Sequence, residues 1–565
     1  MVPGVSVTVT GVTVGFSRTV KSDLQGEFRV QQIPIGSYNV TTAATSGFSA
    51  TKTSEVTVAI ENATLVNIRL SVSTTAESVV VAADAPGPNV DTSDSKVQTN
   101  ITKKLIDQLP KGTSFDSLLK ISPATRAEGR AGGFQVDGAS GSENAFIIDG
   151  LSIENFRTGT LNGVNNLPTS LVSEIQIKTG GFEAEHGGAS GGVISVVTKS
   201  GSDSFHGELS SAFELSGLQP GPRFTLQRFV NSNASPAAIA NNPDYVYVLP
   251  QKKDRFANLF PTAIFSGPVI KGRLWFLGNY SPQVFRATRV SNFINALSNA
   301  DFSTGRFVPS PRLSGGTPLA PLTYKRNIKS EYAFGRLDGA ISDNLRASVT
   351  YLWNPEITDG DIPFDSITTS NPVATPYAGI LYSSDQYARL RGGRTNSNNI
   401  TSQLSWTPTG RLVATFRYGR AFLNQKGGSY GLNDIPRYVC GGSQAAYGTT
   451  ATGCPGGRGF QNILTNNIPV RDVSIKNEYN GDVSYFVNGF GGSHEFKGGY
   501  QYGRTSNDVL SGNAETGTVT LQYGLDYAGA GTGVSLPCSL GSASCIGIGT
   551  LARAGSKGVA RNNYH

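Results

Sequence analysis

The chain has 565 residues, of which 15% are charged and 68 are glycine. This length predicts two to four structural units. The formal net charge of +7 is small and no run of Lys or Arg stands out, so nucleic acid is not an expected partner. No apolar run reaches the ~18 residues of a transmembrane helix. Low charge, abundant glycine and many aromatic residues favour a mainly β protein.

Residues 1–72 alternate between apolar and polar side chains, as short antiparallel strands do. In the first strand Val5, Val7 and Val9 face one side. Further strands are expected at Glu27–Gln31, Tyr38–Ala43, Val56–Ile60 and Leu65–Val72. The spacing predicts a small β-sandwich.

Two segments of this region, Ser22–Phe28 and Ile33–Tyr38, resemble the carboxypeptidase regulatory-like domain. The resemblance implies a prealbumin-like sandwich, a fold also described as carbohydrate-binding-like. A sugar site is not favoured, because no cluster of exposed aromatic residues stands out, and a generic sandwich spacer is the alternative. Members of this family usually begin with one more strand, so we expect truncation ahead of Met1.

Residues 73–100 are rich in Ser, Thr, Ala, Asp, Gly and Pro, which predicts a linker around one short strand, Ser78–Ala82. Residues 101–202 predict a mixed α/β domain. Its short helices are expected at Ile101–Leu109 and Phe115–Ile121, and its strands at Ala145–Ile148, Glu174–Lys178 and Gly192–Lys199.

Residues 203–565 predict long antiparallel hairpins. The hairpins are expected at Phe256–Ser266 with Arg273–Tyr280, Tyr332–Ile341 with Leu345–Trp353, Ile400–Thr407 with Leu412–Tyr418, and Tyr479–Val487 with Glu495–Gly503. Each turns within a few residues, whereas the connections 281–326, 354–398 and 421–474 are long and polar. Alternating short turns and long loops are typical of outer-membrane β-barrels, which close because lipid leaves no backbone group unpaired. A soluble propeller is the alternative, although no blade repeat is visible.

The segment 180–201, which runs from Gly180-Gly181-Phe182 to Lys199-Ser200-Gly201, resembles the end of the plug domain of TonB-dependent receptors, and the Oar-like group fits best. Residues 144–150, 171–177 and 198–207 are similar to other parts of this plug and to the entry into its barrel. The resemblance implies a structural plug motif at Asp149, Gly150, Gly187, Gly188, Gly191 and Gly192. His186 departs from the family, where an aromatic residue is expected, and we assign it no role. A phosphate-binding loop is the rival interpretation, but neither the glycine spacing nor the strand that follows fits it.

Ahead of the plug, the run Glu77-Ser78-Val79-Val80-Val81-Ala82-Ala83 resembles the TonB box of this group. An extended strand with an unpaired edge can add to the sheet of a partner. The alternative is that Ser78–Ala82 ends the sandwich or packs within the linker.

Two cysteine pairs lie in sequence regions expected to be loops: Cys440 with Cys454, and Cys538 with Cys545. No histidine lies near either pair and neither has zinc-ligand spacing, so no metal is expected. Disulfides are favoured, with open connectivity. No catalytic grouping of Ser, His and Asp recurs, so we expect neither an enzyme nor a cofactor.

From residue 203 we count ten or eleven strands, the last near Gly517–Tyr527, against 22 in plugged outer-membrane transporters. We therefore expect an incomplete barrel in a partial chain, whose signal peptide is missing through truncation. The expected fold is mainly β: a sandwich, a mixed α/β plug and an incomplete antiparallel outer-membrane β-barrel.

The family resemblance implies a receptor in the outer membrane of a Gram-negative bacterium, in contact with its lipid. It implies uptake of an extracellular ligand too large for porins, such as a siderophore, an oligosaccharide or a peptide. The TonB–ExbB–ExbD complex would supply the energy through residues 77–83. The alternatives are a surface binding or adhesion protein anchored by the same barrel, and a carbohydrate-binding β protein.

Overall fold

The structure is a computed structural model of the chain. It describes residues 2–72 except 13, 46 and 61–63; residues 79–82; residues 97–222 except 110, 129–132, 156 and 162; and residues 225–229, 245–249, 253–293, 300–301, 306–307, 322–362, 367–368, 392–427, 437–441, 467–489, 492–513, 518–522, 548–550 and 559–562. Within these residues no helix has both the length and the apolar character needed to span a membrane.

The N-terminal unit is built on one five-stranded sheet in the order β2-β1-β3-β4-β5. Its strands are β1 (Ser6–Gly11), β2 (Ser17–Lys21), β3 (Gly36–Thr42), β4 (Thr51–Val58) and β5 (Val79–Ala82). The first four pair antiparallel, and β5 joins β4 in parallel. The alternating valines of β1 lie in its core, as predicted, beside the fully buried Tyr38.

Two of the predicted strands of this unit are wrong. Glu27–Gln31 and Leu65–Val72 form no strand, although Phe28, Val30 and Leu70 pack against the core. Their alternation therefore reflects side chains that cover the sheet, and their backbones make no ladder. The sequence also missed β2, whose five residues Ser17–Lys21 carry little apolar character.

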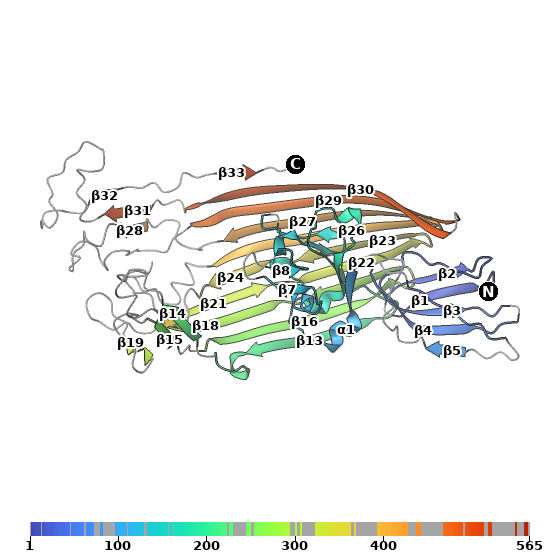
Figure 1. Cartoon of the computed structure of the whole chain (residues 1–565), viewed down its shortest axis with the longest axis horizontal. Coiled ribbons are helices and arrows are strands. Elements are labelled where there is room, and N and C mark those ends of the chain that lie inside the picture. The colour runs from blue at the N-terminus through green and yellow to red at the C-terminus, as the bar shows by residue number, and fades with distance from the viewer. Residues whose placement is uncertain are drawn as a thin grey trace.

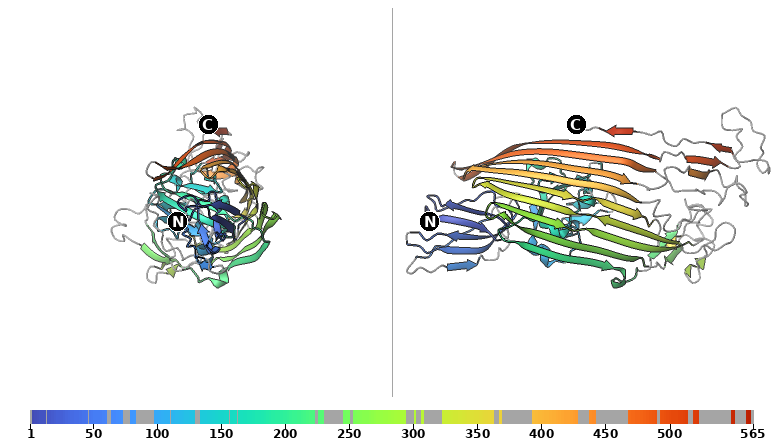
Figure 2. Two further views of the ribbon diagram at one scale, coloured as in Figure 1. Left: turned by 90° about the vertical axis from the view of Figure 1, so that its right-hand side faces the viewer. Right: turned by 180° about the vertical axis from the view of Figure 1, so that it is seen from behind.

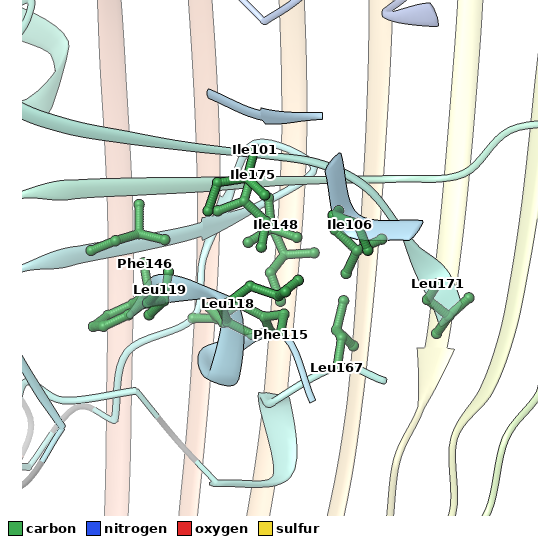
Figure 3. Packing of buried hydrophobic residues seen from close by; sticks show 14 of the residues in the cluster. Ile101, Ile106, Phe115, Leu118, Leu119, Phe146, Ile148, Leu167, Leu171 and Ile175 are labelled. Carbon is green, nitrogen blue, oxygen red and sulfur yellow. The ribbon is translucent and has the colours of Figure 1, made fainter. Parts of the chain in front are cut away.

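The second unit has a five-stranded sheet in the order β10-β9-β12-β11-β6. Its strands are β6 (Val97–Thr102), β9 (Ala145–Ile148), β10 (Leu151–Ser152), β11 (Val172–Gly180) and β12 (Val193–Thr198). The helices are α1 (Lys103–Gln108) and α2 (Asp116–Leu119), and a small hairpin pairs β7 (Thr125–Ala127) with β8 (Phe134–Val136). The predicted helices and strands are confirmed, except that Ile101 and Thr102 belong to β6, which begins inside the predicted linker 73–100. Figure 3 shows apolar side chains of the helices, such as Ile106 and Leu118, packed with those of the sheet in one core.

A large antiparallel sheet curves around this unit (Figures 1 and 2). Its strands are β13 (His206–Leu215), β16 (Arg255–Ile270), β17 (Leu274–Tyr280), β18 (Gln283–Phe293), β21 (Leu322–Ser330), β22 (Ala333–Ser342), β23 (Leu345–Trp353), β24 (Glu356–Gly360), β26 (Gly392–Thr409), β27 (Leu412–Gly427), β29 (Asn467–Gly489) and β30 (Gly492–Asn513). All four predicted hairpins are confirmed. The N-terminal sheet lies at the end of this sheet where the short turns are (Figure 1).

The predicted loops were too long. Strands β18 and β24, the first part of β21, and the outer parts of β26, β27 and β29 fall inside the connections 281–326, 354–398 and 421–474. β17 and β18 pair with successive stretches of β16, so together they make one long barrel strand with a break at 281–282. These outer strand parts are polar, which hid them from a search for apolar alternation.

Shorter strands accompany the large sheet. They are β14 (Thr225–Phe229) with β15 (Tyr245–Leu249), β19 (Ala300–Asp301) with β20 (Arg306–Phe307), β25 (Ile367–Thr368) on β18, β33 (Val559–Asn562) on β30, and β28 (Arg437–Gly441) with β31 (Thr518–Gln522) and β32 (Ile548–Thr550). The last predicted barrel strand, Gly517–Tyr527, corresponds to β31, which lies outside the large sheet.

The two faces of the large sheet differ in chemistry. In β27 the side chain of Phe416 is half exposed on the outer face, whereas its neighbour Thr415 is buried on the inner face. The outward tyrosines 418, 479 and 502 form a row across three strands, with ring centroids 5.0 and 6.2 Å apart. An apolar exterior and a polar interior are the pattern of a membrane barrel. The predicted fold class is therefore confirmed.

Candidate functional site

The Asp149-Gly150 turn ties two plug strands together. Both residues have positive φ, 47° and 84°. Asp149 Oδ1 accepts a hydrogen bond from the Thr198 amide at 3.0 Å, and Oδ2 accepts one from Thr198 Oγ1 at 2.7 Å. The turn after β9 is thereby fixed to the end of β12.

Arg336 connects this turn to the barrel wall. It lies on the inner side of β22, where Nε and Nη2 donate to Asp338 at 2.8 and 3.0 Å. Its Nη1 donates to Thr198 Oγ1 at 3.1 Å and lies 3.6 Å from Asp149 Oδ1. Sequence reasoning missed this residue, because an inward charge on a barrel strand carries no sign of its partner in the plug.

The glycine-rich motif has two parts. A Cβ on Gly191 would lie 2.4 Å from Asn144 Oδ1, and one on Gly192 would lie 2.5 Å from Val136 Cγ1. Close approach therefore explains glycine at these two positions. A Cβ on Gly188 would meet nothing within 4 Å, and one on Gly187 would make only an ordinary contact at 3.4 Å. Nothing in the structure explains glycine at 187 and 188.

Just ahead of Gly187, Glu183, Glu185 and His186 bring one ligand atom each within 4.8 Å of the others. Two lysines already contact this group: Lys178 Nζ lies 2.7 Å from Glu183 Oε2, and Lys497 Nζ lies 2.9 Å from Glu185 Oε1. Burial alone would raise the pKa of Glu185, but Lys497 and nearby positive charges hold it below its ordinary value. Because both carboxylates are paired with lysines, this group is poorly suited to a divalent cation. Its Lys497 contact instead joins plug to β30.

Further polar contacts follow the seam between plug and barrel. Arg157 of the plug lies 2.7 Å from Asp472 of β29. Lys476 of β29 lies 3.5 Å from Glu154 of the plug and 2.8 Å from Glu478 of its own strand. Among the described residues, the plug is thus held against β29 by charged groups rather than by a continuous apolar surface.

Two cavities lie along this seam. The larger, about 830 Å³, is lined by Ser195 of the plug, by Arg417 and Lys497 of the barrel, and by Ile60 of the N-terminal unit. The smaller, about 230 Å³, is lined by amide and hydroxyl side chains that include Asn165 and Asn399. Ser152 lines both cavities, and its amide donates to Glu478 at 3.1 Å between them.

The N-terminal unit reaches the plug through Glu174 of β11. Glu174 Oε1 accepts hydrogen bonds from the Ile60 amide at 3.1 Å and from Asn100 Nδ2 at 3.0 Å. Burial raises the pKa of Glu174 to about 7, although both hydrogen bonds act in the opposite direction. Gln176, two residues along the strand, donates to the Ile60 carbonyl at 2.9 Å.

The structure describes the predicted coupling segment only in part. Val79–Ala82 form β5, and one edge of this strand is occupied because it pairs in parallel with Thr51–Ser54 of β4. Glu77, Ser78 and Ala83 lie outside the described residues. Of the disulfide candidates, Cys440 lies in β28, while Cys454, Cys538 and Cys545 also lie outside the described residues.

A mixed α/β domain inside a curved antiparallel sheet, apolar outside and polar inside, defines a plugged outer-membrane β-barrel. Two family models match the chain: the carboxypeptidase regulatory-like domain over residues 1–71 and the TonB-dependent receptor plug domain over residues 89–193. These matches support a TonB-dependent receptor with an N-terminal regulatory-like domain.

The chain is similar to one curated transporter and to solved structures of outer-membrane proteins. The chain is 26% identical over 376 residues to the TonB-dependent transporter Oar of Myxococcus xanthus, which covers 63% of this chain and 32% of that protein. It is similar to the outer membrane transporter YddB from Escherichia coli, with 16% identity and a TM-score of 0.46. That match covers 75% of this chain and 50% of YddB. It is also similar to the siderophore receptor PirA from Acinetobacter baumannii, with 14% identity and a TM-score of 0.42. That match covers 73% of this chain and 48% of PirA. The chain thus spans about a third of its curated relative and about half of these solved structures.

Proposed function

We propose that the protein takes up an extracellular ligand across the outer membrane of a Gram-negative bacterium, with energy supplied by TonB–ExbB–ExbD. The observation that carries this proposal is the polar seam between the plug and β29 and β30, whereas apolar residues of β16, β17, β22 and β23 pack into the plug core. Charged pairs such as Arg157–Asp472 and Lys476–Glu154 hold the plug in place, and two cavities already separate it from the wall.

A polar seam favours a plug that can rearrange. When an accessible charged pair in an aqueous lumen opens, water solvates both ions, so the net cost is about 1 kcal/mol or less. The cost is larger where one partner is buried, as Asp472 is in its pair with Arg157. An apolar seam of the same size would cost about 25 cal/mol for each Å² exposed. The arrangement therefore supports a plug that moves within the barrel and gives less support to a permanent stopper.

The outer face of the large sheet supports contact with outer-membrane lipid. Large side chains such as Leu209, Phe265 and Trp406 are exposed there, and a soluble protein rarely exposes so extensive an apolar surface. The row of tyrosines at 418, 479 and 502 suits an interface of lipid and water. We place these strands in the membrane, with the short turns on the periplasmic side.

Residues 77–83 are the proposed coupling segment. β5 is the last strand of its sheet, so one of its edges has no neighbour in the sheet order. A strand of TonB could add to that edge or replace the pairing with β4, since backbone pairing depends little on side-chain identity. The ligand class stays open among siderophore, oligosaccharide and peptide; one similar solved structure is named as a siderophore receptor.

The test is a pull-down with the periplasmic domain of TonB from outer-membrane fractions that contain the full-length protein. Deletion of residues 77–83 should abolish capture, while deletion of residues 84–90, a linker segment of equal length, should leave it intact. Both variants must keep the heat-modifiable mobility of a folded barrel.

Equal capture of both deletion variants would remove residues 77–83 as the coupling segment. Absence of any capture from the unaltered protein would favour the adhesion alternative, which needs the barrel and its loops but no energy coupling. Absence of the protein from the outer membrane would contradict the membrane assignment itself.

A further inference from the structure

We propose that the regulatory-like domain is a cap that closes the short-turn mouth of the barrel and must undock before the larger cavity opens on that side. This domain contacts both the plug and the barrel rim. Such a cap needs neither a ligand nor TonB, so it goes beyond the proposed uptake.

The first contact is close packing of the Gly15 backbone, in the turn between β1 and β2, against the barrel rim. A Cβ at this position would lie 2.1 Å from the indole ring of Trp275, at the start of β17. Arg346 of β23 donates to the Gly15 carbonyl at 2.9 Å. The same guanidinium lies 5.2 Å from the ring centroid of Phe16 and 5.4 Å from that of Trp275. Only glycine fits this approach, and an arginine between two aromatic rings stabilises it.

The second set of contacts spreads over neighbouring short turns. Arg18 of β2 donates to the Asp343 carbonyl at 2.9 Å, in the turn between β22 and β23. Gln32 donates to Thr415 Oγ1 of β27 at 3.0 Å. Arg29 lies 4.9 Å from the ring centroid of Phe486, near the end of β29. The domain therefore touches the rim at several hairpins instead of hanging from one linker.

The third contact is with the plug. The Ile60 backbone bonds to Glu174 and Gln176 of β11 through both its amide and its carbonyl. Ile60 also lines the 830 Å³ cavity, so the domain forms part of the wall of that cavity. A single body that contacts the rim and forms part of the cavity wall lies at the short-turn end of the large sheet (Figure 1), where it can close that side of the lumen.

The same contacts allow the cap to leave. Apart from the packing of Gly15 on Trp275, they are separate polar and cation–π contacts, each of which water or another partner can replace. The core of the domain, from Val5 to Val56, forms its own apolar cluster, distinct from that of the plug. Undocking therefore exposes polar groups and the indole of Trp275, and leaves both cores intact.

The cap is tested by the access of a bulky maleimide to the cavity. Ser195 of β12 lines the cavity, so Ser195→Cys serves as the reporter in a full-length protein whose native cysteines are replaced by serine. Gly15→Val places a side chain against Trp275 and should raise the labelling rate about tenfold. Val12→Thr, an exposed change in the same turn, should leave the rate unaltered.

Docking is measured separately by a bis-maleimide bridge between Gln32→Cys and Thr415→Cys, in chains without the reporter. Gly15→Val should lower its yield about tenfold. A second bridge, between Thr8→Cys and Thr19→Cys on paired strands within the domain, should form equally in both backgrounds if the domain keeps its fold. Arg346→Ala acts from the barrel side, cannot unfold the domain, and should reproduce both effects.

Two outcomes would overturn the cap. In one, Gly15→Val and Arg346→Ala leave the Gln32–Thr415 bridge at its original yield, so the packing at Gly15 does not hold the domain. In the other, the bridge is lost while labelling of Ser195→Cys stays slow, so the domain docks without closing the cavity. Because no ligand and no TonB enter the assay, these results are independent of the outcome for uptake.

Discussion

Removal of the Arg336 side-chain charge should loosen the plug at the Asp149 turn. In Arg336→Met, the carboxylates of Asp149 and Asp338 lose the guanidinium that lies 3.6 and 2.8 Å away. The side chains of these three residues are only 9 to 15% exposed, so water replaces the guanidinium poorly. Loss of one partner from a buried pair costs about 3–5 kcal/mol, and the partial exposure favours the lower end.

Hydrogen exchange of the β12 amides is the assay, because β12 ends at Thr198, which Arg336 contacts. A loss of about 3 kcal/mol in local stability should accelerate exchange about 100-fold where local opening limits it. Arg411→Met, at the exposed short turn between β26 and β27, is the matched control and should leave β12 unchanged.

A double-mutant cycle with Asp149→Asn tests the pairing directly. If Arg336 acts on the plug through Asp149, the two changes together should cost less than the sum of the single changes, by about 1 kcal/mol or more. Strict additivity would refute the link between the barrel arginine and the plug turn. Unchanged β12 exchange in Arg336→Met would refute it as well.

Three further outcomes are expected. Gly419→Ala should lower the unfolding midpoint, because its Cβ would lie 2.5 Å from Leu151 Cδ1 and such overpacking costs about 1–3 kcal/mol. Adding Leu151→Ala should restore part of the lost stability. Docking of the regulatory-like domain should weaken as pH rises from about 4.5 to 7: burial raises the pKa of Glu174 to about 7, so the docked state keeps a proton that an exposed carboxyl releases. Docking is measured as the yield of the Gln32–Thr415 bridge, divided by the yield of the Thr8–Thr19 bridge within the domain. Glu174→Gln should make this ratio independent of pH over the same range. Lys178→Met should destabilise the plug in the same exchange assay, because it removes the cation 2.7 Å from Glu183, whereas an exchange pattern like that of the unaltered protein would show that the pair contributes nothing.

The sequence determined the elements whose signal is local. Alternation in 345–353 and 412–418 predicted strands facing lipid on one side and the lumen on the other, and the structure confirms β23 and β27. The glycine-rich run 180–201 indicated the end of the plug, where Gly191 and Gly192 do approach other residues closely. Periodicity and turn residues act over a few positions, so they can be read without knowledge of the rest of the chain.

Only the tertiary structure decided which distant residues meet. Arg336 and Asp149, Gly419 and Leu151, and Gly15 and Trp275 become neighbours because the sheet curves around the plug and the N-terminal domain seats on its rim. No local pattern encodes these pairs, since each depends on barrel curvature and on the placement of a separate domain. The pKa of Glu174 likewise follows from its burial beneath Ile60, a residue that belongs to another domain.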